Sequence, residues 1–169
     1  MIINNIIYIG KIKFFITLMR FFIVFCFLML SKPLFADILL PSPSLLPEEV
    51  VTIQLDALKN NNIPYVNAGI EQAWEFAHPS NRKFTGPLDN FKNMLLSPAY
   101  SLVLNFQEYK IIPVKKNEYQ SLFFIELKDK NGIMIGFQWI VEKVQKNGKY
   151  NNCWMTISVS QPIYLSKSA

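Results

Sequence analysis

Apolar residues between residues 47 and 98 recur every three or four positions, which is the spacing of one face of a helix. In the stretch PEEVVTIQLDALKNNN, residues 47–62, this face consists of Val51, Leu55 and Leu58. Pro47 suits the first position of a helix, because the N–H that it lacks would have no partner there. Asparagine is a poor helix former, so the pattern predicts a helix that ends among the three asparagines.

Two further segments share this spacing, at residues 66–77 and 85–98. Their apolar faces consist of Ile70, Ala73, Trp74 and Ala77 in the first and of Leu88, Phe91 and Leu95 in the second. The residue before a proline avoids the helical region, so His78 before Pro79 predicts the end of the second helix. Pro87 predicts the start of the third helix.

After residue 98 the apolar residues alternate with polar ones, which is the repeat of a half-buried strand. The four alternating segments are residues 101–109, 119–128, 133–144 and 153–159. The sequence DKNG, residues 129–132, predicts a hairpin turn, and Gly136 predicts a bulge or a bend. In the last segment the faces would consist of Cys153, Met155, Ile157 and Val159 on one side and of Trp154, Thr156 and Ser158 on the other.

Helices followed by antiparallel strands predict an α+β domain with the helices on one face of the sheet. We expect three N-terminal helices packed on a curved four-stranded antiparallel sheet, in a cone-shaped domain at residues 47–161. An extended, proline-spaced segment at residues 37–46 would precede the domain, and a C-terminal tail at residues 162–169 would follow it.

Residues 1–36 predict a secretory signal peptide. Arg20 precedes ten apolar residues, and the string SKPLFA then supplies a small residue at the cleavage site. Ten residues of helix are about 15 Å long, half the thickness of a membrane core of about 30 Å. We therefore expect export to a periplasm or to the exterior, with a thylakoid lumen as an equivalent destination. Met19 is an alternative start, and an uncleaved anchor at residues 14–30 is the alternative to cleavage.

Loss of residues 1–36 would change the charge of the protein. The chain has 17 basic and 12 acidic residues, and the first 36 residues contain four of the basic ones and none of the acidic ones. The remainder therefore has 13 basic and 12 acidic residues, which does not support a nucleic-acid surface. Cys26 would also be lost, and Cys153 would remain without a disulfide partner, as a buried thiol.

Four strings resemble the bacterial and plant family catalogued as domain-of-unknown-function family 4864: PSPSLLPEEVVTIQLDALKNN, NAGIEQAWEFAHPSNRKFTGPL, FKNMLLSPAY and CWMT. The resemblance covers about residues 41–161, and the second string is its most specific part. It implies a fold similar to the cone-shaped nuclear-transport-factor-like and cystatin-like α+β domains. It implies no activity and no catalytic residues, because the family is named for lacking an assigned function.

The sequence offers few groups for catalysis. Zinc needs three or four His, Cys or acidic ligands, whereas the chain beyond residue 36 has one His and one Cys, so we expect no metal and no cofactor. The sharpest enzymatic hypothesis pairs His78 with Glu75 or Asp89 as acid and base in a pocket. The alternative, which we favour, places His78 at a helix C-terminus, against free carbonyls.

Asn81 and Arg82 allow a similar choice. An arginine can anchor a carboxylate or phosphate of a ligand, and an asparagine in a turn often bonds its own backbone. Arg82 can equally pair with Glu75 or Asp89 and hold the corner between two helices. We favour the corner, in which a helix stop, a turn and a short extended piece lead to a helix started by proline.

Aromatic side chains are the remaining candidates for a binding site. They are Trp74, Tyr100, Tyr119, Trp139 and Trp154. Such residues line small-molecule pockets together with a few polar groups, and they also fill cores. Both interpretations stay open for these five residues.

Three functions follow as hypotheses. The first is an exported, non-catalytic binding or scaffold domain that encloses a small apolar ligand. The second is a small cone-fold isomerase or hydro-lyase that uses His78 with a carboxylate. The third is a module that forms a homodimer through an open sheet face, suggested by Trp154 opposite Cys153 and Met155. None of the three involves nucleic acid or a stable membrane span after cleavage.

Overall fold

The computed structural model describes residues 16–20, 22 and 37–167. The chain divides into two units between Ala36 and Asp37, and residues 16–20 and 22 of the first unit are helical. The other residues of the predicted signal peptide, its cleavage site included, lie outside the described part. Within the described part, none of the helices has the length and apolar character that crossing a membrane requires.

The second unit begins with helices. Their bounds are α2 (Pro47–Lys59), α3 (Ala68–Glu75), α4 (Pro79–Thr85), α5 (Leu88–Leu96) and the short 3-10 helix η1 (Ser101–Val103). The predicted stripe of α2 is confirmed, because Val51, Leu55 and Leu58 are all buried. The Glu49 carboxylate accepts the N–H of Leu46 at 2.7 Å, which satisfies one free donor at the start of α2.

Helix α4 was not predicted, so the expected number of three helices is too low. Helix α3 already ends at Glu75, and Pro79 occupies the first position of α4, where a proline is favoured. His78 is the N-cap of α4, and its Nδ1 accepts the N–H of Ser80 at 3.1 Å. Gly86 ends α4 with φ +84°, a conformation that favours glycine. The corner between α3 and α5 is therefore helical, not a turn with an extended piece.

The sheet follows the helices. Its strands are β1 (Glu108–Lys116), β2 (Gln120–Lys128), β3 (Ile133–Lys143), β4 (Trp154–Val159) and β5 (Ile163–Lys167). Strands β1 to β4 are neighbours in chain order, and all of these pairs are antiparallel. Strand β5 pairs with residues 133–136 of β3, and β4 with residues 139–143. Residues 162–169, expected as a tail, thus supply a fifth strand.

Two of the strand predictions need correction. The first strand lies at residues 108–116, because residues 101–103 form η1 and Asn105 has φ +53°. Strand β4 contains a bulge, since Thr156 pairs with Val141 and Ser158 with Ile140. This register change turns Trp154, Thr156 and Val159 toward the helices, whereas Cys153 and Met155 pack on the other side.

Gly136 does not form a bulge with β2, because the register between β2 and β3 passes through it without a shift. The glycine instead allows the side chain of Phe124 to approach the backbone of β3 closely. A Cβ atom at this position would overlap the ring of Phe124.

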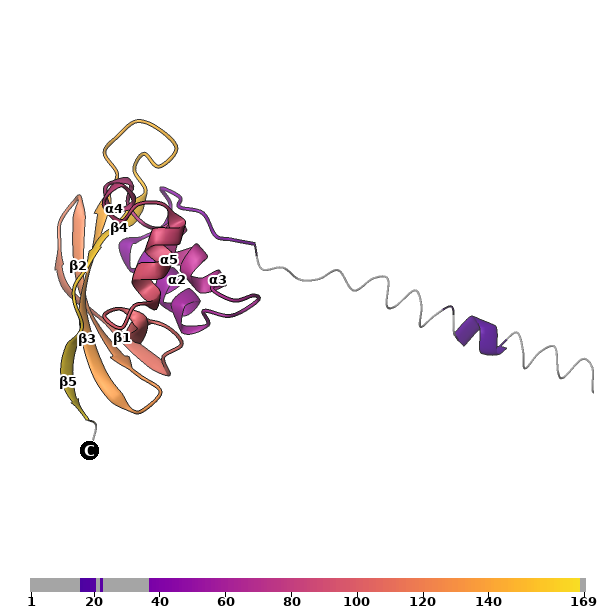
Figure 1. Ribbon diagram of the computed structural model, residues 1–169. Coiled ribbons are helices and arrows are strands. Elements are labelled where there is room, and N and C mark those ends of the chain that lie inside the picture. The colour runs from indigo at the N-terminus through magenta and orange to yellow at the C-terminus, as the bar shows by residue number, and fades with distance from the viewer. Residues whose placement is uncertain (1–15, 21, 23–36, 168–169) are drawn as a thin grey trace, which may run out of the picture. The chain divides into compact units, whose positions relative to one another are not determined.

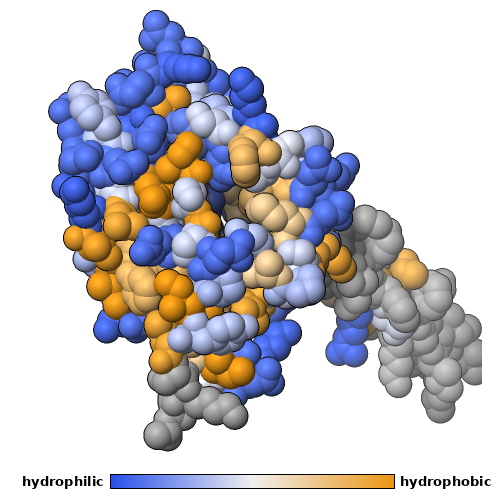
Figure 2. All heavy atoms as spheres, turned by 60° about the vertical axis from the view of Figure 1, so that its left-hand side comes forward, coloured by the Kyte–Doolittle hydropathy of each residue, from blue (hydrophilic) through white to orange (hydrophobic). Residues whose placement is uncertain are grey.

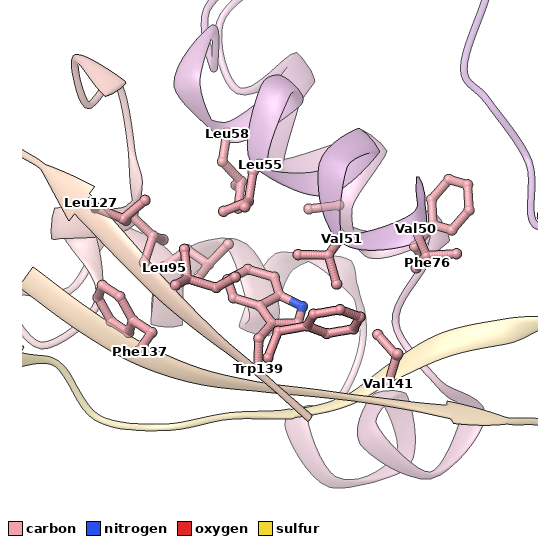
Figure 3. Packing of buried hydrophobic residues seen from close by; sticks show 14 of the residues in the cluster. Val50, Val51, Leu55, Leu58, Phe76, Leu95, Leu127, Phe137, Trp139 and Val141 are labelled. Atoms are coloured by element: carbon pink, nitrogen blue, oxygen red, sulfur yellow. The ribbon is translucent and has the colours of Figure 1, made fainter. Parts of the chain in front are cut away.

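The core lies between the helices and one face of the sheet. Figure 1 shows α2, α3 and α5 on the same side of the strands. In Figure 3, Val51 and Leu55 of α2 face Trp139 and Val141 of β3. All four side chains are at most 3% exposed, and the prediction of an α+β domain with the helices on one face is confirmed.

Candidate functional site: a pocket between the helices and the sheet

A pocket with a volume of about 170 Å³ lies between helices α2 to α5 and strands β3 and β4. Its apolar lining consists of Leu58, Ala73, Ala77, Phe84, Phe91, Met94, Leu95, Val103, Trp139, Ile157 and Val159. Its polar lining consists of Gln54, Asn81, Thr85, Tyr100, Thr156 and Ser158. The pocket is therefore mainly apolar, with polar groups at a few positions.

The buried polar groups of the pocket bond to one another. The Thr156 hydroxyl donates to Oε1 of Gln54 and accepts the Nε1–H of Trp139 at 3.0 Å. The amide of Gln54 donates to the carbonyl of Ala73 at 2.9 Å. Gln54 and Thr156 are each 2% exposed, so these bonds satisfy groups that would be costly to bury unpaired.

The backbone of Thr156 also joins β4 to the corner between α3 and α4. Its N–H donates to the carbonyl of Phe76 at 2.8 Å, and its carbonyl accepts the N–H of His78 at 2.8 Å. The same carbonyl accepts Nδ2 of Asn81 at 3.3 Å. Asn81 therefore bonds the backbone of a distant strand, not its own turn.

The lining of the pocket offers few groups for acid–base chemistry. Among the described residues, the pocket has no acidic, lysine, arginine, histidine or cysteine side chain, and Tyr100 is its one titratable group. The Tyr100 hydroxyl accepts Nε2 of Gln161 at 3.1 Å. The Phe84 ring, 92% exposed, lies where the pocket meets solvent.

A second hollow, of about 500 Å³, lies between the start of α4 and the connection from β3 to β4. Unlike the pocket, it has charged residues in its lining, which includes His78, Ser80, Lys83, Glu142, Lys146 and Lys149. Burial lowers the pKa of His78 below its ordinary value; the Glu142 carboxylate opposes this shift, and Lys146 adds to it. We call this hollow the basic groove.

The predicted ligand residues divide between the pocket and other places. Asn81, Tyr100 and Trp139 line the pocket. Trp154 is buried in the core, so it does not lie on an open sheet face as the dimer hypothesis assumed. Tyr119 is 47% exposed and lies between β1 and β2, outside the pocket lining.

Arg82 holds the corner between α3 and α4. Its guanidinium group donates to the carbonyls of Trp74, Glu75 and Ala77 at 2.7–3.0 Å. It also lies 3.6 Å from the Glu75 carboxylate and 5.0 Å from the centre of the Trp74 ring. The Trp74 ring also packs on Phe91, with the ring centres 5.1 Å apart. These contacts are those of a structural residue.

Neither of the predicted acid–base partners of His78, Glu75 and Asp89, is shown to pair with it. Glu75 is paired with Arg82, and Asp89 is exposed in the first turn of α5. The carboxylate whose charge acts on His78 is that of Glu142. No cluster of three or more His, Cys, Asp or Glu residues that could hold a metal ion occurs in the described part of the chain.

Two important pocket residues were absent from the sequence-based candidates. Gln54 had a signal, since it lies on the apolar face of α2 between Val51 and Leu58, where a polar side chain needs a buried partner. Thr156 had none, because its partners come from α2 and β3. The prediction of a buried thiol at Cys153 is confirmed by its 1% exposure.

Comparison with known proteins does not identify the chain, since no family model, no curated protein and no solved structure matches it. The resemblance of residues 41–161 to the domain-of-unknown-function family therefore stays a prediction.

Proposed function

We propose that the domain binds a compact apolar small molecule in the pocket, without catalysis. The observation that carries this proposal is the lining: a mainly apolar surface without a charged side chain, in which Gln54 and Thr156 bond to each other. Because these two side chains already bond to each other, an apolar ligand can contact the lining without breaking hydrogen bonds of the protein. Such a concave apolar surface with few polar groups is typical of small-molecule sites.

The size of the pocket limits the ligand. An engineered protein cavity of about 150 Å³ binds benzene. The pocket has a volume of about 170 Å³ and opens to solvent beside Phe84. A ligand with one aromatic ring or a short branched chain would fit inside, and a longer chain would extend past Phe84.

The test uses Trp139, whose indole lines the pocket. We expect benzene, indole or a short-chain alcohol to change the tryptophan fluorescence in a saturable way. Val103→Phe would fill the pocket from η1 and should abolish this binding, whereas Val114→Phe, at a 58% exposed position of β1, should leave it unchanged. Native mass spectrometry of protein from its host would then show a bound mass. Equal responses of both variants, or no saturation, would refute the proposal.

The proposal includes the cone-shaped fold that the family resemblance implies and the export of the protein through a cleaved signal peptide. The quoted strings and the order of helices and strands support a cone-shaped fold of the kind the resemblance implies. The apolar segment before Ala36 supports export and cleavage. The mass of the protein recovered from its host tests this: a chain that begins at Asp37 supports cleavage, and one that retains residues 19–36 contradicts it.

A second candidate function is a homodimer through the sheet face that points away from the helices. This face carries Ile112, Leu122, Phe124, Met134, Ile140, Ile163 and Leu165, all of which are half-buried or exposed. Figure 2 shows hydrophobic residues across the middle and lower part of this side of the molecule. Lys110 pairs in register with Glu126 on the same face, so its charges balance.

This face suits a second copy of the chain. Four strands about 4.8 Å apart and about 30 Å long cover roughly 550 Å² in projection, and side chains raise this toward the ~800 Å² per partner of a standard interface. A membrane surface would instead attract a basic face. Sedimentation should show a dimer that Leu122→Glu disrupts and that Val66→Glu, at a 72% exposed loop position, does not. A wild-type monomer at high concentration would exclude it.

A further inference from the structure

The basic groove holds charges that the apolar pocket does not use. Three lysines line it, Lys83 from α4 and Lys146 and Lys149 from the connection between β3 and β4. One carboxylate, that of Glu142, opposes them. A group with two negative charges would therefore find a balanced environment in the groove.

His78 supplies a directed donor to the same groove. Its Nδ1 accepts the N–H of Ser80, so the proton of the neutral imidazole is on Nε2. His78 is 7% exposed, and among the described residues its Nε2 has no hydrogen-bond partner. The Nε2–H is not buried away from solvent, so it is open to the groove, and an accessible N–H without a protein partner in a groove lined by three lysines is suited to an oxyanion.

The walls of the groove are held in place by the fold. In the connection between β3 and β4, the N–H of Val144 donates to the carbonyl of Cys153 and the N–H of Asn152 to that of Val144, both at 2.9 Å. Tyr150 of this connection packs on the small buried cluster, and its ring lies 5.4 Å from the Arg82 guanidinium. Arg82 in turn fixes α4, which contains Lys83 and has His78 as its N-cap.

We propose that the basic groove binds a phosphate monoester group, with the Nε2–H of His78 as donor and the three lysines as counter-charges. The volume of about 500 Å³ leaves room for the group that carries the phosphate. This site is separate from the apolar pocket and does not depend on the function proposed for it. The phosphate could belong to a soluble ester or to the headgroup of a lipid, and the experiment distinguishes the two.

The test follows the imidazole signals of the full chain by NMR, which need no assignment because the sequence has one histidine. Inorganic phosphate, added at constant ionic strength against chloride, should shift these signals in a saturable way. Lys146→Gln and Lys149→Gln should each weaken binding about two- to fivefold, as expected for a partly screened charge pair. Glu142→Gln should tighten it by a similar factor. Lys115→Gln on β1 is the control and should have no effect.

Vesicles that contain phosphatidic acid then identify the source of the phosphate. If wild-type protein binds them and the Lys146→Gln and Lys149→Gln variants bind them more weakly, the ligand is a lipid headgroup. If inorganic phosphate saturates the site and the vesicles do not bind, the ligand is a soluble ester. The proposal is overturned if neither probe acts on His78, or if Lys115→Gln weakens binding as much as Lys146→Gln.

Discussion

A single guanidinium group closes the C-terminal end of α3. Arg82 donates to three carbonyls there, in a half-buried place. Arg82→Ala would remove the bonds to Glu75 and Ala77 and one of the two bonds to Trp74, whose carbonyl also accepts the N–H of Ala77. We expect this change to lower the free energy of unfolding by about 2–3 kcal/mol, since hydrogen bonds to charged groups contribute about 1.5–3 kcal/mol. Arg82→Lys should recover less than half of the loss, because an ammonium group lacks the planar fork. Urea unfolding measures both.

The neighbouring Lys83 provides the control for Arg82. It lies in the same helix and is exposed, so Lys83→Ala should change the free energy of unfolding by about 0.5 kcal/mol or less. An Arg82→Ala variant as stable as Lys83→Ala would contradict the role of Arg82 in the corner.

His78 makes the stability of the domain depend on pH. Burial lowers the pKa of His78 in the folded state, so the unfolded chain takes up this proton first as the pH falls. The contribution of His78 to stability is full above about pH 6.5, the ordinary pKa, and is lost as the pH falls through the folded pKa. His78→Asn keeps an N-cap but does not titrate, so it should abolish this loss. Thermal unfolding of the wild type and of His78→Asn between pH 7.5 and 5 tests this. If the melting temperatures of both proteins fell equally with pH, His78 would not be the cause of the loss.

At the scale of single residues, His78 lies at the start of α4 and not at the end of α3, where we expected it. A residue that precedes a proline can follow the end of one helix, and it can equally be the N-cap of a helix that begins with the proline. Only the presence of α4 decides between them, and α4 buries none of its own residues. Without an apolar stripe it has no periodicity to detect, and contacts of Arg82, Asn81 and His78 hold it in place.

At the scale of elements, α2 and α3 meet at Gly69. A Cβ atom at this position would overlap the backbone carbonyl of Ala57. We expect Gly69→Ala to push the helices apart and to lower the free energy of unfolding by about 3 kcal/mol, the upper part of the range for overpacking. Gly132→Ala is the matched control, because a Cβ atom added there would meet no other atom within 4 Å and its φ of +79° is the source of strain, at about 1 kcal/mol. Equal costs in urea unfolding would mean that the helices tolerate the overlap.

Strands β2 and β3 could be predicted closely because their inward residues alternate without interruption. Ile125 and Leu127 of β2 and Phe137 and Trp139 of β3 are all buried. Strand β4 could not, because its bulge reverses the alternation at Ile157, and nothing in the strand itself marks this position. The alternation of Leu102, Leu104 and Phe106 misled for another reason. The 3-10 turn buries Val103 instead, and the next buried residue is Phe106, whereas Leu102 and Leu104 are only half-buried.

At the scale of the whole molecule, the pocket depends on residues that are far apart in the chain. Gln54 and Thr156, which bond at its floor, are separated by 102 positions. No local pattern can report such a pair, whereas the aromatic composition pointed to Trp139 and Tyr100, which line the pocket. The fold class was therefore accessible from periodicity, and the assembly of the pocket was not.

Strand β5 completes the sheet, and its removal is the prediction that tests the whole fold. Deletion of residues 162–169 would leave residues 133–136 of β3 without a partner on one side. We expect the loss of several ladder hydrogen bonds, at about 1 kcal/mol each, to lower the free energy of unfolding by about 2–4 kcal/mol. The open edge should also promote aggregation on sedimentation.

The control for this deletion removes only residues 168 and 169, which follow β5, and should leave stability unchanged. If both truncated chains unfolded at the same temperature as the full chain, the pairing of β5 would add nothing to the sheet. If only the longer deletion is destabilised, the last strand is part of the folding unit. In that case the outward-facing Ile163 and Leu165 are held where the proposed dimer needs them.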